Sequence, residues 1–423
     1  MERLLHYVWK YKLYTASSLL TTTEGNTVEI IDPGLENGNA GPDFFNAKIK
    51  IDGTLWVGSV ELHDKASDWL LHCHHLDKAY DNVILHVVGV DDFQPKRTNG
   101  ESIPQWVLTI PKHVSRNVEW LLYRETPLPC LDYISQIDPL HLSAWLEVLL
   151  TERLERKTHD ILNLLAFYKE DWNEVFYITL TRNFGFGLNN DAFERLAKSI
   201  PFRCIQKQRN NHSQIEALLL GQAGMLVEEK GDHYYRLLQR EYTFLRHKYG
   251  LIPLDDSVFK HLRIRPMSFP YLKIAQLASL WVQHDTLFSA ILEARTPGEV
   301  KRFFRVSPSP YWETHYHFRY ASPKKEKVMG ENALHILLIN TVVPMFFAYG
   351  LHHKQSEYCE RALRLLESIP PERNSIVTLF CKAGITVRNA GDTQGLIQLK
   401  REYCEKKKCL YCRIGFRMLK CKD

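Results

Sequence analysis

Apolar positions near the start of the chain follow the period of a helix first and the period of strands afterwards. Leu5, Val8 and Trp9 share a helical spacing with their apolar neighbours, which predicts a helix over residues 3–20. Residues 27–32, TVEIID, predict a strand. The glycines, asparagines and proline that follow them leave no regular alternative to a loop.

A β-hairpin is expected next. Its strands cover residues 44–51 and 54–62 and are joined at Asp52-Gly53, a dipeptide typical of hairpin turns. A short helix is expected over residues 66–79.

Two further strands complete the N-terminal pattern. Residues 82–90 read NVILHVVGV, a nearly continuous apolar run that is typical of a strand buried on both faces. Residues 103–111 predict a shorter strand. The order is therefore helix, three strands, helix, strand, with one more strand after it.

Helical patterns dominate the rest of the chain. PLPC at residues 127–130 breaks the chain, and helical spacing recurs from about residue 138 onward. We therefore expect an α+β protein with a sheet-containing domain over residues 1–125 and a mainly helical domain, of one or two parts, over residues 126–423. The total length of 423 residues also favours more than one core.

Composition indicates a soluble globular protein. Apolar residues make up 45% of the chain and charged residues 24%, without a low-complexity tract. The most apolar run, residues 333–351, carries His335, Asn340 and Pro344, which predicts a buried, kinked helix rather than a bilayer span. The N-terminus lacks a cleavage-like site, so we expect a cytoplasmic protein without a membrane partner.

The carboxylates around the hairpin depend on its turn. Glu61 and His63 lie two residues apart on one strand, so their side chains share a face. A two-residue turn at Asp52-Gly53 would place Asp43 opposite Leu62, on the other face. A three-residue turn would place Asp43 opposite Glu61, and both turns suit these residues.

Two facing carboxylates repel each other unless a cation lies between them. Mg²⁺ or Mn²⁺ takes such oxygen ligands, stabilises charge on a phosphoryl oxygen and lowers the pKa of a bound water. His63 would position or deprotonate that water. The alternative is structural: Asp43 caps the loop and Glu61 is a solvated carboxylate at the end of a strand.

These residues resemble the motif of the PD-(D/E)XK nuclease superfamily, with Pro42-Asp43 before the second strand and Glu61-x-His63 on the third. Over residues 1–110, the resemblance implies a restriction-endonuclease-like core with a mixed sheet and catalytic roles for Asp43, Glu61 and His63. His63 stands where the superfamily usually has lysine. With a histidine at this position, the motif is similar to that of the very-short-patch repair endonucleases.

The chain as a whole resembles the bacterial domain-of-unknown-function family 2851, found mainly in Bacteroidetes. The stretches that carry this resemblance are NAGPDF, GSVELH, SDWLLHCHH, YDNVILHVV, RPMSFP and CLYCRIG. It covers nearly the whole length but implies no established activity.

A histidine group follows the hairpin. On a helix, His72 and His75 would share a face at i, i+3, whereas His74 would point elsewhere. Together with His63, the histidines predict a zinc site, because imidazole is a common zinc ligand. His86 lies inside an apolar strand and is expected to be a hydrogen-bonded core residue.

The C-terminal tail carries a second candidate metal site. Cys404, Cys409, Cys412 and Cys421 have the spacing C-x4-C-x2-C-x8-C, and the C-x2-C pair is typical of a zinc or iron–sulfur knuckle. Cys130, Cys359 and Cys381 are alternative fourth ligands, and plain reduced thiols are the other interpretation. The sulfurs of a zinc site would lie about 4 Å apart.

The tail is also basic. Residues 400–423 hold nine lysines and arginines against three acidic residues, whereas the rest of the chain has a net charge of −1. A phosphate-binding patch and a solvated helix end both fit this excess.

Three functions remain open. The first is a metal-dependent nuclease whose partner is DNA or RNA. The second is a binding or scaffold protein with an inactive nuclease fold, and the third is a zinc hydrolase that uses the histidines. The oligomeric state is not predicted by the sequence.

Overall fold

The computed structural model describes residues 2–14, 20–228 and 231–420, and the chain divides into two compact units. The first unit comprises Met1–Leu142 and the tail that begins at Lys400, and the second comprises Ser143–Leu399. From the sequence we expected the boundary between the two domains near residue 125 and the C-terminal tail in the helical domain. The expected α+β class, with an N-terminal mixed sheet followed by a helical region, is confirmed.

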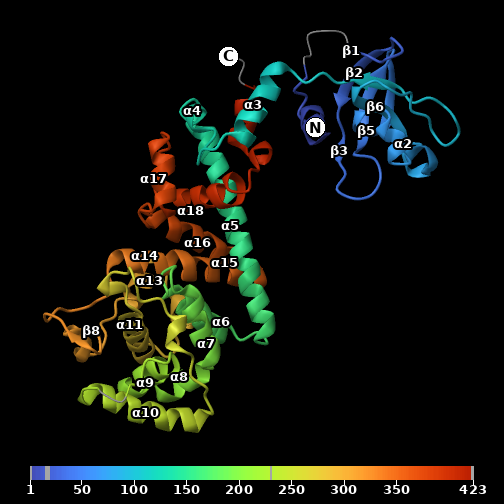
Figure 1. The fold of residues 1–423 in the computed structure, drawn as a ribbon. Helices are drawn as coiled ribbons and strands as arrows, with labels where there is room; N and C mark the ends of the chain where they lie inside the picture. The colour runs from blue at the N-terminus through green and yellow to red at the C-terminus, as the bar shows by residue number, and fades with distance from the viewer. Residues whose placement is uncertain (1, 15–19, 229–230, 421–423) are drawn as a thin grey trace. The chain divides into compact units, whose positions relative to one another are not determined.

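The first unit is built around one sheet, whose strands are drawn in blue and cyan in Figure 1. The elements are α1 (Glu2–Lys10), β1 (Leu20–Thr21), β2 (Thr27–Asp32), β3 (Leu35–Glu36), β4 (Phe44–Ile51), β5 (Thr54–Lys65), α2 (Asp68–Leu71), β6 (Val83–Val90), β7 (Gln105–Val107), α3 (Lys112–Tyr123), α4 (Leu131–Ile134) and α19 (Arg413–Lys420).

The strand order is β1-β2-β4-β5-β6-β7, and β3 also pairs with β4. Neighbours from β1 to β5 run antiparallel, whereas β6 and β7 run parallel to β5. This arrangement agrees with the predicted order of helix, three strands, helix and strand, except that two further two-residue strands, β1 and β3, precede β4. The strands predicted over residues 27–32, 44–51 and 82–90 are confirmed almost to the residue.

The two predicted helices of this unit are shorter than expected. The first ends at Lys10. The second, expected over residues 66–79, is broken: α2 ends at Leu71, and Cys73 has a left-handed backbone with φ 61°. Two short 3-10 turns, His74–Leu76 and Lys78–Tyr80, complete the segment.

The core of the first unit joins α1, the sheet and the tail. Trp9, Phe44 and Leu62 are fully buried in it, and Leu419 of α19 is equally buried. The side chain of Asn117 on α3 donates a hydrogen bond of 3.0 Å to the backbone oxygen of Met418. The tail is therefore part of this core.

The β4–β5 hairpin combines a tight turn with a β-bulge. Ile51 pairs with Thr54, so the turn has two residues, and both Asp52 and Gly53 have positive φ, as a type I′ turn requires. Farther along the hairpin the register shifts by one residue between Phe44 and Ala47, where Asn46 has φ 57°. Such a shift is the signature of a bulge, in which one strand contains an extra residue.

The second unit is helical apart from one small hairpin, β8 (His315–His317) and β9 (Tyr320–Ala321). Its helices are α5 (Pro139–Phe167, whose first turn belongs to the first unit), α6 (Trp172–Asn183), α7 (Asn190–Ser199), α8 (Phe202–Gln208), α9 (His212–Gln222), α10 (His233–Tyr249), α11 (Pro270–Gln283), α12 (Leu287–Glu293), α13 (Pro297–Phe303), α14 (Glu331–Leu337), α15 (Val343–His352), α16 (Ser356–Ser368), α17 (Ser375–Lys382) and α18 (Ala390–Gln398).

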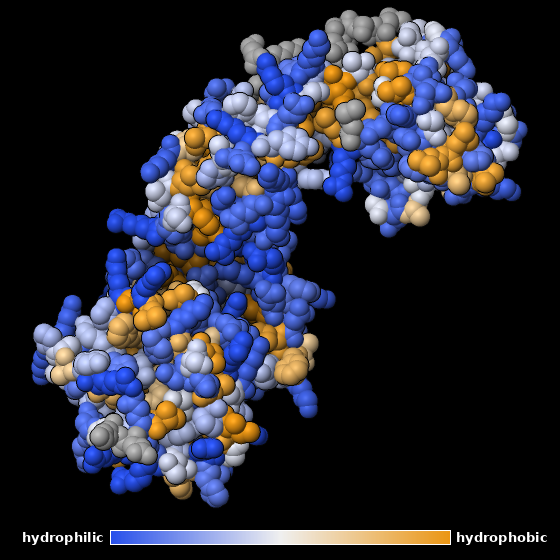
Figure 2. Space-filling model, in the orientation of Figure 1, coloured by the Kyte–Doolittle hydropathy of each residue, from blue (hydrophilic) through white to orange (hydrophobic). Residues whose placement is uncertain are grey.

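The most apolar run of the chain lies inside the second unit. By length and composition alone, Glu331–His352 could cross a membrane, but 67% of its most apolar window is buried within the protein. A π-helical turn, Leu338–Val342, interrupts it just before Pro344. The view in Figure 2 shows a surface that is largely hydrophilic, with apolar side chains in separate patches.

Candidate metal centre

Strand β5 carries the first two residues of the site. Glu61 and His63 lie two positions apart and are 4% and 1% exposed, respectively. The neighbouring strand β6 is almost wholly buried, and Glu61 pairs with His86 across the two strands. Polar groups at such depth need partners, because an unpaired buried charge or hydrogen-bonding atom is costly.

Asp43 is one partner of Glu61. The backbone N–H of Asp43 donates to Glu61 Oε2 at 3.0 Å, and the backbone N–H of Leu62 donates to Asp43 Oδ2 at 2.9 Å. His6 Nε2 lies 3.3 Å from the same Asp43 oxygen. Asp43 therefore reaches Glu61 with a two-residue turn, an arrangement that we expected only for a three-residue turn.

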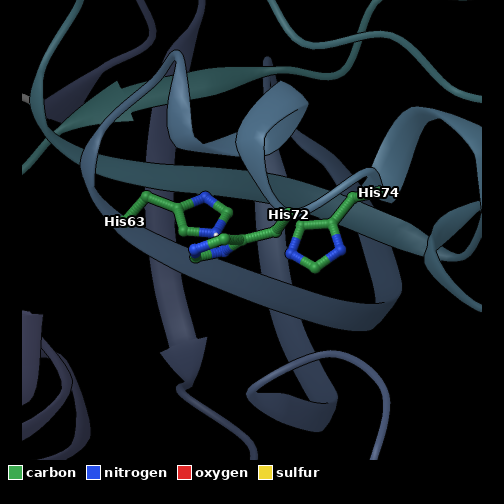
Figure 3. A group of neighbouring side chains, drawn as sticks. All are labelled: His63, His72 and His74. Atoms are coloured by element: carbon green, nitrogen blue, oxygen red, sulfur yellow. Dashed lines mark hydrogen bonds between the residues drawn. The ribbon is translucent and has the colours of Figure 1, made fainter.

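The histidines converge in a way that the sequence did not predict. His72 and His74, on either side of the left-handed Cys73, both approach His63, as Figure 3 shows. Each of the three offers a ring nitrogen, and the three nitrogens lie within 4.8 Å of one another. His75 is not in this group. The prediction that pairs His72 with His75 assumed a regular helix, and the break after Leu71 removes its basis.

A carboxylate oxygen faces the same space. Glu61 Oε1 lies 3.2 Å from His74 Nε2 and 3.6 Å from His63 Nε2. His63 Nε2 in turn lies 3.1 Å from His72 Nδ1. Three imidazoles can thus supply three ligand atoms to a metal ion, and the Glu61 carboxylate lies beside two of them. His72 is exposed, so the group has an opening to solvent.

A chain of buried hydrogen bonds fixes which nitrogen of His63 is available. Gln105 Nε2 donates to Asp91 Oδ1 at 2.6 Å, so the amide oxygen of Gln105 must accept from His86 Nδ1, which lies 2.9 Å away. His86 Nε2 is then the acceptor for His63 Nδ1, at 2.8 Å. We infer that the free lone pair of His63 is on Nε2, facing Glu61 and His72.

Burial also keeps the inner histidines neutral. It lowers the pKa of His63 to about 2, with help from the neighbouring histidines, and it lowers the pKa of His86 to about 4. Burial raises the pKa of Glu61, although the hydrogen bond from His74 opposes this rise. Neutral imidazoles are the form that binds metal ions.

Sequence reasoning named Asp43, Glu61, His63 and His72, which lie in or beside this group, whereas it expected His74 to point elsewhere. It assigned His86 to a hydrogen-bonded core position, which is confirmed. Gln105 carried no signal, because only the parallel pairing of β6 with β7 places it beside His86.

The tail cysteines lie in the first unit, remote in sequence from the histidines. Cys404, Cys409 and Cys412 do not all lie within 4.8 Å of one another, so the expected separation of about 4 Å is not met. Cys421 falls outside the residues that the structure describes. Cys359 and Cys381, the alternative fourth ligands from the second unit, lie on α16 and α17.

Comparison with known proteins identifies the family of this chain. Residues 2–375 match the model of a family described as "Protein of unknown function (DUF2851)". No curated protein and no solved structure matches the chain.

Proposed function

The chain belongs to the DUF2851 family, and we propose that it is a divalent-metal-dependent hydrolase that cleaves phosphodiesters of nucleic acid. One observation carries the proposal. Ring nitrogens of His63, His72 and His74 lie within 4.8 Å of one another, and a carboxylate oxygen of Glu61 faces two of them.

The ligand types favour a transition metal. Imidazole suits Zn²⁺ and tolerates Mn²⁺, whereas Mg²⁺ prefers oxygen ligands. We therefore propose Zn²⁺ or Mn²⁺ at this group, and Mg²⁺ only for a site made by Glu61 and Asp43. Such an ion would stabilise charge on a phosphoryl oxygen and activate a water.

The residues of this chain would hold the ion and orient its ligands and the attacking water. The hydrogen bonds through His86 and Gln105 keep His63 Nε2 turned toward the ion. Asp43, whose side chain is 23% exposed, lies at the margin of the group and would position the attacking water or a second ion. The exposed His72 marks the side from which substrate would enter.

The order of elements supports the choice of nucleic acid as substrate. The helix, three antiparallel strands, short helix and parallel strand carry Asp43 and Glu61-x-His63 at the positions where the PD-(D/E)XK nucleases have their motif.

A second candidate is a binding protein without catalysis. The contacts of Asp43 favour it, because one carboxylate oxygen already accepts from the backbone of Leu62 and lies beside His6. In that case the histidine group holds a structural metal or none.

The experiment compares cleavage of fluorescent single- and double-stranded DNA and RNA by the wild-type protein and three variants, with Zn²⁺, Mn²⁺ or Mg²⁺. We expect Glu61→Gln and His63→Ala/His74→Ala to lose at least 100-fold in rate. His75→Ala is the matched control and should keep the wild-type rate.

Cleavage that is equal in all four proteins would show a contaminant and overturn the proposal. Absence of cleavage, together with a metal-dependent rise in melting temperature that His63→Ala/His74→Ala abolishes, would favour the binding protein.

A further inference from the structure

Four cysteines of the first unit come from two distant parts of the chain. Cys130 is the residue before α4, Cys404 ends a π-helical turn, and Cys409 begins a 3-10 turn after which Cys412 leads into α19. Cys412 is 7% exposed, and Cys130, Cys404 and Cys409 are half-buried.

Hydrogen bonds pin the tail along the segment that leads to Cys130. Lys400 Nζ donates to the backbone oxygen of Pro127 at 3.1 Å. Lys407 Nζ donates to the backbone oxygen of Leu122 at 2.9 Å. The thiol of Cys409 donates to the backbone oxygen of Leu121 at 3.6 Å. Residues 400–409 therefore lie against residues 121–127, three positions before Cys130.

Cys130 and Cys409 also pack against the same apolar core of the first unit. Burial raises the pKa of Cys404, and the nearby Cys412, Cys130 and Cys409 raise it further. Burial raises the pKa of Cys130 to about 12, with further contributions from Cys412 and Cys409. These pKa directions agree with the packing of residues 400–409 against residues 121–127.

We propose that Cys130, Cys404, Cys409 and Cys412 form a four-thiolate metal centre. Four cysteines are the usual ligand set of structural zinc and of iron–sulfur clusters. The C-x2-C pair lies on a tight turn, which is the local geometry of a metal knuckle. Cys130 thus takes the place that the C-x8-C spacing suggested for Cys421.

The separation of the sulfurs indicates which kind of metal centre they can hold. A single zinc ion requires its sulfurs to lie about 4 Å apart, whereas no three of these four sulfurs lie within 4.8 Å of one another. In a [4Fe–4S] cluster each of the four thiolates binds a different iron atom, so the sulfurs lie farther apart. Both centres share the thiolate chemistry, and the metal content distinguishes them.

The proposal assigns the tail a structural role. Metal binding would tie α3, the segment before α4 and α19 together at one point. Since α19 contributes Met418 and Leu419 to the core of the first unit, loss of the metal would loosen that core. This role is independent of the proposed hydrolase activity.

The test measures iron and zinc in the full-length protein purified without oxygen, together with its visible absorption. We expect a stoichiometric amount of one metal, with visible absorption if it is iron. Cys130→Ser and Cys409→Ser should each lose at least tenfold of that metal. Cys359→Ser is the matched control, because its half-buried thiol also donates to a backbone oxygen, that of Phe347 at 3.7 Å.

Far-UV circular dichroism identifies variants that fail to fold, and removal of the metal from the wild type with a chelator avoids mutation altogether. We expect chelation to lower the melting temperature of the wild type but not of Cys130→Ser. His63→Ala/His74→Ala should keep this metal, which separates the centre from the histidine group. Neither metal in the wild type, or full metal content in Cys130→Ser, would overturn the proposal.

Discussion

Asp43 and Glu61 are joined across two antiparallel strands by a hydrogen bond from the backbone N–H of Asp43 to Glu61 Oε2, 3.0 Å long. The bond exists because the bulge at Asn46 shifts the register of β4 against β5 by one residue. With the same two-residue turn and no bulge, Asp43 would lie on the opposite face of the sheet from Glu61. The bulge, not the turn, therefore brings the two carboxylates together.

The left-handed backbone of Asn46 can be tested by substitution. We expect Asn46→Val to lower the free energy of unfolding by about 1–2 kcal/mol, because a β-branched residue is strained at φ 57°. Asn46→Gly should be nearly neutral, since glycine adopts this conformation freely. Urea denaturation measures both. Equal stability of Asn46→Val and Asn46→Gly would contradict a bulge at this position.

The hydrogen bonds behind His63 should matter for metal affinity. Gln105→Leu removes the acceptor of His86 Nδ1, so His63 would no longer be held with its Nε2 lone pair toward Glu61. We expect Zn²⁺ affinity, measured by calorimetric titration, to fall about 10–100-fold. Gln94→Leu is the control, because the side chain of Gln94 donates only to the backbone oxygen of Ile103. The same affinity in both variants would refute the role of Gln105.

Acid should destabilise the metal-free protein through His86. Its pKa is about 4 in the folded state and near 6.5 when unfolded, so the unfolded state takes up a proton first as the pH falls. The contribution of His86 to stability is therefore fully present above about pH 6.5 and is lost down to pH 4, by about 3 kcal/mol, and His63, whose pKa is about 2, adds to the decline. His86→Gln should show a flatter decline in urea denaturation measured across this range. An unchanged slope would contradict the prediction.

Glu216, on α9 in the second unit, predicts the opposite trend. It is fully buried, it accepts a hydrogen bond from Trp312 Nε1, and burial raises its pKa from 4.5 to about 7. The folded state therefore holds a proton that the unfolded state has lost, and stability falls as the pH rises from 4.5 to 7. Glu216→Gln keeps the hydrogen-bond acceptor and abolishes the charge.

We expect Glu216→Gln to exceed the wild type in the free energy of unfolding by about 3 kcal/mol at pH 8 and to match it near pH 4. Glu241→Gln, on the neighbouring helix α10, should show no such difference between the two pH values. Thermal or urea denaturation at both pH values provides the measurement. A Glu216→Gln variant that is less stable than the wild type at pH 8 would be incompatible with a buried charge.

Local patterns predicted the strands well because each is specified by its own residues. TVEIID at residues 27–32 and the run at residues 82–90 form strands where their periodicity indicated them. Asn46, by contrast, sits in a strand-like pattern, and its bulge follows from pairing with β5. The convergence of His74 with His63 depends on the left-handed backbone of Cys73, which a helical pattern does not reveal.

Long-range proximity was the other part that the sequence could not provide. Cys130 and Cys409 lie far apart along the chain, and only the packing of the tail onto the core of the first unit brings their segments together. The same holds for Gln105 and His86, which become neighbours through parallel strand pairing.

The route of the chain has a consequence for synthesis on the ribosome. The first unit begins at Met1, is left at Leu142 and is resumed only at Lys400. Its core therefore lacks Met418 and Leu419 until the second unit has been translated. The second unit is contiguous and can fold while synthesis continues. The sheet that carries the histidine group is thus synthesised before the second unit, whereas its core is completed only after that unit.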